Sequence, residues 1–184
     1  MSSLYNINPS LTVAFSGYRP DKIKKSDPNN NFLFAEIQAR LLGTIHKLAE
    51  QGYKTFLSGM AAGFDLMAAS AVLLARNTYP EIELICVVPF PDQAFNFAPY
   101  WKVEHSNILR QAQRNITLFG SYHRSVYHRR NDFLIENSSI LVCYYDGQPG
   151  GTHYTVTAAR KQGLNIENLC QTEKASSPLI YKSK

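Results

Sequence analysis

Short apolar runs alternate along the chain with longer segments in which apolar residues recur every three or four positions. The runs are typical of strands, and the spacing from Phe34 to Leu48 is typical of a helix that ends at Gly52. The predicted strands cover residues 11–16, 55–58, 82–88, 116–119, 140–145 and 166–169. The predicted helices cover residues 34–48, 64–77, part of 101–113, 132–137 and 152–162.

This alternation predicts an α/β fold, a single three-layer Rossmann-like domain with a mostly parallel sheet between two helical layers. The apolar run 82–88 lies between Pro80 and Pro89, as expected for a strand that is covered on both faces. We expect residues 11–170 to form the domain, residues 1–10 to be flexible, and residues 171–184 to be a mobile tail. The pattern leaves the oligomeric state open.

Composition and charge set wide limits. The chain has 184 residues, 45% of them hydrophobic and 18% charged, which is typical of a globular domain. The formal charge of +5 comes largely from lysines in a predicted polar loop and in the tail, so it does not by itself indicate nucleic acid. These lysines are Lys22, Lys24, Lys25, Lys174, Lys182 and Lys184.

Cellular location and metal binding follow from what the sequence lacks. The start of the chain carries no secretion signal and no apolar stretch is long enough to span a membrane, so we expect a cytoplasmic protein. Cys86 and Cys143 lie in apolar runs, as buried free thiols of a reducing compartment do. Neither the cysteines nor the histidines have the spacing of metal ligands, so we expect no metal site, and we expect that no cofactor is required.

Ligands of open parallel sheets bind at the carboxyl ends of the strands, so the turns after the strands are the candidate site. In the first turn Gly17 frees the backbone and Arg19 is a candidate phosphate ligand, or else the partner of a surface carboxylate. The second turn runs from Ser58 through Gly59 and Gly63 to Asp65, at the start of the next helix.

Asp65 has two interpretations of about equal weight. A carboxylate at a helix start is stabilised by the helix dipole without any ligand. In a ligand site the same carboxylate would repel phosphate, so it would take ribose hydroxyls, a base amine or a reacting water.

Two later turns complete the candidate site. Gln93 follows a proline-rich turn, and the aromatic residues after it either stack a base or, as we favour, cover the end of the core. These aromatic residues are Phe95, Phe97, Tyr100 and Trp101. The last turn carries Asp146 and then a second glycine-rich helix start, Gly150-Gly151-Thr152, which is another candidate anion cradle.

Basic and aromatic residues interleave over 122–130. Such a segment is typical of nucleic-acid or nucleotide-phosphate binding, although a solvated face before a helix has the same pattern. We expect Arg124 and Arg129 to belong to a solvated face, whereas Arg130 is assigned to the site by the family resemblance that follows.

Several of these motifs occur together in one known family. They are Gly17-Tyr18-Arg19-Pro20, Ser58-Gly59 with Gly63 and Asp65, Pro89-Phe90 with Gln93, Arg130 before residues 133–136, and Tyr145-Asp146. In this order they resemble the YpsA family of the SLOG superfamily, which also includes DprA proteins and the cytokinin-activating LOG enzymes. The resemblance covers residues 13–159 and implies a bacterial Rossmann-like domain whose glycine-rich turns bind a nucleotide or a nucleotide-derived ligand.

Two departures weaken an enzymatic interpretation. LOG enzymes carry a catalytic Glu after their Pro-Gly-Gly-x-Gly-Thr motif, and Thr155 stands at that position here. Asp65 stands where YpsA relatives often carry Glu, and it would have to act as the catalytic residue alone. We therefore expect a nucleotide-binding module, for which a sensor role is one hypothesis. A nucleotide N-glycosidase of the phosphoribohydrolase type and DprA-like binding of single-stranded DNA remain as alternatives.

Overall fold

The computed structural model describes residues 5–170. A short 3₁₀ helix, η2 (Pro9–Leu11), precedes an alternating series of strands and helices. The strands are β1 (Thr12–Gly17), β2 (Thr55–Ser58), β3 (Glu83–Val88), β4 (Arg114–Thr117), β5 (Ile140–Tyr144) and β6 (Asn165–Asn168). The helices are α1 (Pro20–Ser26), α2 (Leu33–Glu50), α3 (Phe64–Ala75), α4 (Pro99–Gln111), α5 (Val126–Glu136) and α6 (Gly151–Gln162).

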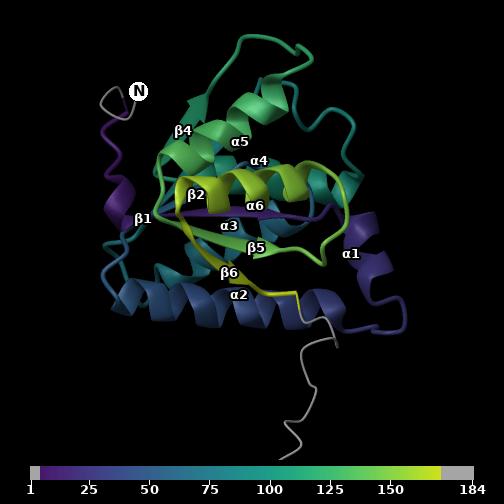
Figure 1. The fold of residues 1–184 in the computed structure, drawn as a ribbon, viewed down its shortest axis with the longest axis horizontal. Helices are drawn as coiled ribbons and strands as arrows, with labels where there is room; N and C mark the ends of the chain where they lie inside the picture. The colour runs from purple at the N-terminus through teal and green to yellow at the C-terminus, as the bar shows by residue number, and fades with distance from the viewer. Residues whose placement is uncertain (1–4, 171–184) are drawn as a thin grey trace, which may run out of the picture.

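The strands form one sheet in the order β4-β3-β2-β1-β5-β6, and every pairing in it is parallel. From β1 to β4 the chain moves outward in one direction, and it then returns to place β5 on the other side of β1 (Figure 1). Strand order therefore reverses between β1 and β5, where Gly17 pairs with Tyr144. This topology confirms the predicted Rossmann-like α/β fold.

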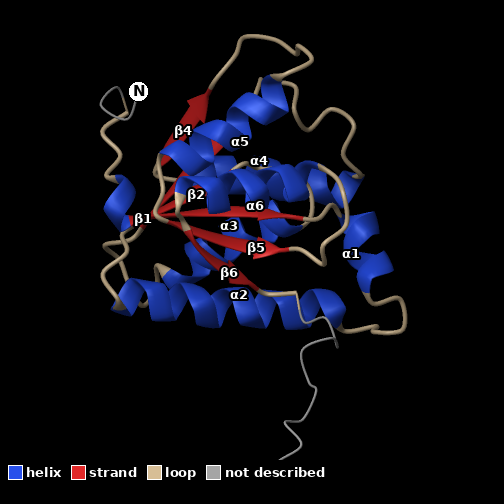
Figure 2. Ribbon diagram, in the orientation of Figure 1, coloured by secondary structure: helices blue, strands red, loops and turns tan. Residues whose placement is uncertain are grey.

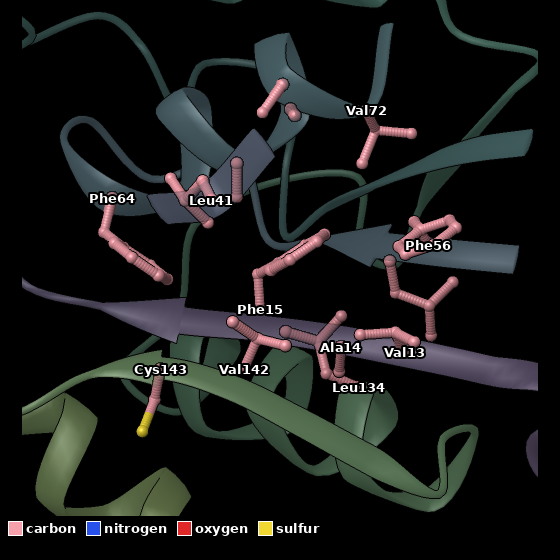
Figure 3. Close-up of a cluster of buried hydrophobic side chains, with 14 of the residues drawn as sticks. Val13, Ala14, Phe15, Leu41, Phe56, Phe64, Val72, Leu134, Val142 and Cys143 are labelled. Atoms are coloured by element: carbon pink, nitrogen blue, oxygen red, sulfur yellow. The ribbon is translucent and has the colours of Figure 1, made fainter. Parts of the chain in front are cut away.

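Helices cover both faces of the sheet, as Figure 2 shows. Helix α3 packs on β1, β2 and β3 and against α2 and α4, whereas α5 and α6 pack together on the opposite face. Side chains alternate between these two layers along β1. Figure 3 shows Phe15 on the same side of β1 as Leu41 and Phe64, while Ala14 lies near Leu134. Phe15 also stacks on Phe56 from β2, with ring centroids 6.1 Å apart.

Two helices differ from the prediction. Residues 20–26 form helix α1, so the prediction of a polar loop around Lys22 and Lys24 was wrong. Pro20 at the first helical position and Asp21 in the first turn are signals of a helix start, and Ile23 anchors the short helix in the core. Helix α5 begins at Val126, earlier than the predicted start at residue 132.

The remaining differences lie at the starts of two elements: helix α4 begins at Pro99, two residues before the predicted range 101–113. Strand β4 begins two residues before the predicted run at 116–119. The expected flexibility of residues 1–10 stays a prediction; in their described part Ile7 is buried and the rings of Tyr5 and Phe133 meet edge to face. The predicted tail, 171–184, lies outside the described residues. Within residues 5–170, no helix has the length and apolar character needed to cross a membrane.

Candidate functional site

A pocket of about 410 Å³ lies at the carboxyl edge of the sheet, where strand order reverses. One wall is the turn from β1 into α1, and the other is the turn from β5 into α6. The starts of α3 and α5 close it below. Its lining residues are Ser16, Gly17, Tyr18, Arg19, Lys22, Ala61, Asp65, Tyr127, Arg130, Asn131, Pro149, Gly150, Gly151 and Thr152. We call this space the β1–β5 pocket.

The structure brings many of the predicted site residues together in the β1–β5 pocket, from four separate turns and helices. The predicted residues that line it are Gly17, Arg19, Asp65, Arg130, Gly150, Gly151 and Thr152. Ser58, Gly59, Gly63, Gln93 and Asp146 do not line it. Instead, these five residues make hydrogen bonds or close backbone contacts in the turns around the pocket.

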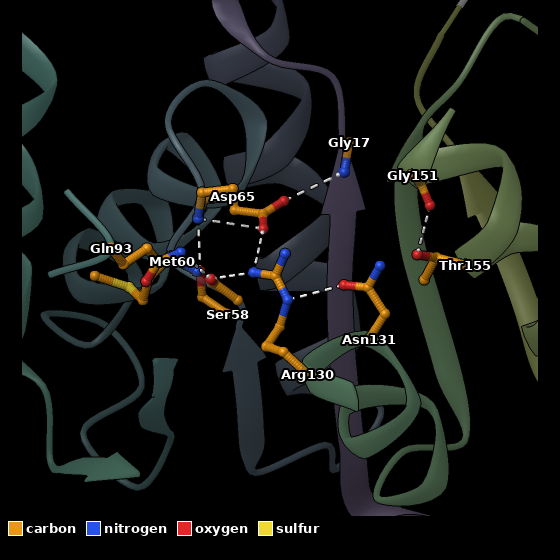
Figure 4. Close-up of polar contacts among 11 residues, drawn as sticks. Gly17, Ser58, Met60, Asp65, Gln93, Arg130, Asn131, Gly151 and Thr155 are labelled. Atoms are coloured by element: carbon orange, nitrogen blue, oxygen red, sulfur yellow. Dashed lines mark hydrogen bonds and ion pairs between the residues drawn. The ribbon is translucent and has the colours of Figure 1, made fainter. Parts of the chain in front are cut away.

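Asp65 and Arg130 meet at the base of the pocket (Figure 4). Both side chains are more than nine-tenths buried, and Arg130 Nη1 lies 3.5 Å from Asp65 Oδ2. The carboxylate also accepts hydrogen bonds from the backbone N–H of Gly17 at 3.2 Å and of Ala61 at 3.4 Å. Asp65 thereby joins the turn after β1 to the turn after β2.

Burial dominates the electrostatics of this pair. It raises the pKa of the Asp65 carboxyl, although the positive charges of Arg130 and Arg19 and the two backbone N–H groups act in the opposite direction. Burial also lowers the pKa of Arg130 from its ordinary value, which is far above neutral, and the Asp65 charge opposes that shift. Arg130 therefore remains a cation at neutral pH.

Further bonds hold the Arg130 guanidinium in one orientation. Its Nε donates to Asn131 Oδ1 at 2.8 Å, and its Nη1 donates to the carbonyl of Gly59. Gln93 Nε2 donates to the same carbonyl at 2.9 Å. A Cβ atom on Gly59 would collide with the guanidinium, so glycine is required there for the close approach of Arg130. Gly59 and Gln93 thus position Arg130 from outside the pocket.

The other residues outside the pocket also have structural partners. Ser58 Oγ donates to the carbonyl of Asp65 and accepts from the N–H of Met60, which fixes the turn after β2. Gly63 has a φ of 94°, and a Cβ there would lie 2.5 Å from the carbonyl oxygen of Tyr18. Asp146 accepts hydrogen bonds from the Tyr18 hydroxyl and from the N–H of Gln148.

Buried side chains around the pocket retain free hydrogen-bonding atoms. Arg130, Asn131 and Thr152 are each more than nine-tenths buried. Within residues 5–170, Arg130 Nη2, Asn131 Nδ2 and Thr152 Oγ1 have no hydrogen-bond partner. The first two can only donate, and a hydroxyl can donate. All three atoms can therefore donate to an acceptor in the pocket.

The start of α6 adds backbone donors. Gly150 is the N-cap with a φ of 140°, and no side chain caps the helix. The first N–H groups of a helix have no carbonyl partner within it, and the helix dipole makes this end positive. Lys22 Nζ donates to the carbonyl of Pro149 at 2.9 Å and lies 4.1 Å from the centroid of the Tyr18 ring. A lysine is therefore held beside the N-terminus of α6.

Lys22, Tyr127 and Asn131 are pocket residues that sequence reasoning missed. Tyr127, Arg130 and Asn131 occupy positions i, i+3 and i+4 of α5 and so share one face of that helix. An earlier predicted start of this helix would have found them. Lys22 was missed with helix α1, although Pro20 and Asp21 signal that helix.

Comparison with solved structures gives the same fold. DNA processing protein A (DprA) from Streptococcus pneumoniae superposes with a TM-score of 0.59 at 14% identity, over 90% of this chain and 51% of that one. The chain therefore spans about half the length of that protein. DprA from Helicobacter pylori, solved for its single-stranded DNA binding mode, gives a TM-score of 0.59 at 18% identity, over 94% and 70% of the two chains.

Sequence comparison is more specific. A UPF0398 protein from Bacillus cereus strain B4264 is 28% identical over 162 residues, which cover 85% of each chain. A UPF0398 protein from Bacillus thuringiensis strain Al Hakam is 27% identical over the same length. The model of the YpsA family, described as "YspA SLOG family", matches residues 13–172. The chain therefore belongs to the YpsA family of SLOG proteins.

Proposed function

We propose that the β1–β5 pocket binds the phosphate of a nucleotide or nucleotide-derived ligand, and that the protein acts as a binding module with a sensor role. The observation that carries the proposal is that Arg130, Asn131 and Thr152 all line this pocket and each has a donor atom that bonds to no described residue. A phosphate supplies several acceptor oxygens in a small volume, which is what three converging donors need.

The charges around the pocket favour the same ligand. Arg19, Lys22 and Arg130 are cations that line it, and the N-terminus of α6 adds a partial positive charge. Asp65 is the carboxylate of the pocket, and its charge is compensated by Arg130 and two backbone N–H groups. In this proposal Asp65 holds Arg130 in place and accepts a ribose hydroxyl through Oδ1.

Turnover has less support than binding. The Thr155 side chain at the position of the LOG catalytic Glu is buried, and its hydroxyl donates to the carbonyl of Gly151 at 2.9 Å. Asp65 would be the single acid or base, because no other carboxylate is among the described residues that line the pocket. We place the binding function in the bacterial cytoplasm, where buried thiols such as Cys86 stay reduced.

Thr152→Val tests this proposal, because valine keeps the shape of threonine and removes the hydroxyl. A hydrogen bond to a charged group contributes about 1.5–3 kcal/mol, so we expect calorimetry with GMP and AMP to show affinity reduced by roughly 10- to 100-fold. Thr157→Val is the matched control, because Thr157 is an exposed residue of the same helix and does not line the pocket. Unchanged affinity in folded Thr152→Val would remove the start of α6 from the site.

Binding of single-stranded DNA is the second candidate. The H. pylori DprA structure concerns that activity. Here Tyr122, Arg124 and Arg129 are exposed near the start of α5, as a base-stacking and phosphate-binding surface requires. If this candidate is right, affinity for an oligonucleotide falls steeply as the salt concentration rises. The double variant Arg124→Ala, Arg129→Ala should then show a smaller slope of log affinity against log salt concentration. A nucleotide held in the β1–β5 pocket would depend on neither arginine.

A further inference from the structure

A second pocket, of about 600 Å³, lies beside the first and has no part in the function proposed above. It is enclosed by α1, α2, α3 and α4, and Figure 1 shows α1 next to the start of α2. Adjacent residues divide the two spaces: Arg19 and Asp65 line the β1–β5 pocket, while Pro20 and Leu66 line this one. We call it the α1–α4 pocket. The two pockets are thus lined by neighbouring residues at the starts of α1 and α3.

The apolar part of the α1–α4 pocket suits a flat ring. Trp101 and Tyr100 contribute aromatic side chains from α4, and Phe34 contributes one from α2. Leu66 and Met67 add aliphatic surface from α3. Aromatic rings stack favourably on such side chains, by about 1–3 kcal/mol for a nucleobase.

The polar part of the pocket offers acceptors. Glu104 Oε1 accepts a hydrogen bond from Ser70 Oγ at 2.7 Å, and among the described residues Glu104 Oε2 has no partner. Gln38 Nε2 donates to the carbonyl of Met67 at 3.3 Å, and its Oε1 is likewise unpartnered within residues 5–170. These two oxygens can accept hydrogen bonds from N–H donors on a ligand.

A lysine completes the polar part. Lys24 lines the pocket from α1, and no described residue pairs with its ammonium group. A ring that bonds to all three groups presents N–H donors on one edge and acceptors on another. Guanine has N1–H and N2–H₂ donors for a carboxylate, and its O6 and N7 accept from lysine. Adenine offers only its amine to Glu104, and uracil lacks an amine.

We propose that the α1–α4 pocket is a nucleobase site that prefers guanine. Glu104 and Lys24 form hydrogen bonds with the edges of the base, and Trp101 contacts the face of the base. The inference extends the proposed phosphate site, because the base and the phosphate of one nucleotide-derived ligand would occupy the two pockets. It does not depend on that site for its test, since a nucleoside carries the base without the phosphate.

Trp101 makes the test direct, because it is the one tryptophan of the chain. We expect guanosine to quench its fluorescence saturably, with affinity at least tenfold higher than that of uridine or cytidine. The same quenching should persist in Thr152→Val, which affects the phosphate site. If GMP binds by calorimetry and leaves Trp101 fluorescence unchanged, the phosphate proposal stands and the base proposal is wrong.

Two variants localise the guanosine signal. Ala35 is an exposed α2 residue that lines the pocket, so the larger side chain in Ala35→Phe fills the space. The guanosine affinity measured from quenching should fall at least tenfold. Ala39→Phe is the matched control, since Ala39 is exposed on the same helix and does not line the pocket. Glu104→Gln keeps an acceptor for Ser70 and removes the charge, so guanosine should lose its preference over uridine. Equal quenching by guanosine in Ala35→Phe and in wild type would overturn the proposal.

Discussion

Asp65 and Arg130 lie far apart in the sequence, and the sequence alone gives no reason to connect them. The sequence indicates Asp65 as a site residue by its place at the start of a helix, and Arg130 by the motif that resembles the YpsA family. It does not show that they form a buried pair, since their contact requires α3 and α5 to approach from opposite faces of the sheet. The pair changes the role of Asp65 from a free carboxylate to the partner of a buried cation.

This role predicts a stability effect. Asp65→Asn leaves the Arg130 charge buried without its partner and should lower the free energy of unfolding by about 3–5 kcal/mol, measured by urea denaturation. Asp21→Asn is the control: Asp21 is an exposed acid in the first turn of α1, and its loss should cost less than about 1 kcal/mol. A similar small cost for both variants would mean that Asp65 only favours the helix start.

At the scale of helices and strands, hydrophobic pattern predicts the buried elements best. Strand β3 was predicted almost to its bounds, because a strand covered on both faces has a continuous apolar run. Helix α1 was missed because Ile23 is its one buried residue, so it has no apolar periodicity to detect. The start of α5 was missed for a related reason: its exposed basic residues obscure the face that carries Tyr127 and Arg130.

Helix α4 gives a prediction at this scale. His105 of α4 is buried against Phe97, its Nε2 has no hydrogen-bond partner, and burial lowers its pKa from the ordinary 6.5. As the pH falls, His105 is therefore protonated in the unfolded chain before it is protonated in the fold. The stability that depends on neutral His105 is present above about pH 6.5 and is lost below it. At pH 5.5 the loss should reach up to about 1.4 kcal/mol.

Denaturation with urea at pH 7.5 and pH 5.5 measures this loss. His105→Phe removes the titrating group, and its free energy of unfolding should change less between the two pH values than that of wild type. If the difference between the two pH values is the same in wild type and in His105→Phe, protonation of His105 does not control stability in this range.

At the scale of the whole molecule, the β1–β5 pocket results from topology. The chain returns from β4 at one edge to place β5 beside β1, and this return brings Gly150 and Thr152 to the turn that carries Gly17 and Arg19. Alternating strands and helices predict a parallel sheet with ligand turns at one edge, but they do not give the strand order. Ser58, Gly59 and Gln93 were therefore predicted as ligand residues, whereas the structure shows them supporting the pocket from outside.

Ligand-induced stabilisation tests the central claim most directly. A nucleotide present at a hundredfold excess over its dissociation constant should stabilise the fold by about 2.7 kcal/mol. For a domain of this size, the melting temperature should then rise by roughly 5–10 °C. We expect at least one of GMP, AMP, ADP-ribose, NAD or the cyclic dinucleotides to produce this rise in wild type and a much smaller one in Thr152→Val. No rise with any of these ligands would contradict the account of the pocket as a nucleotide site.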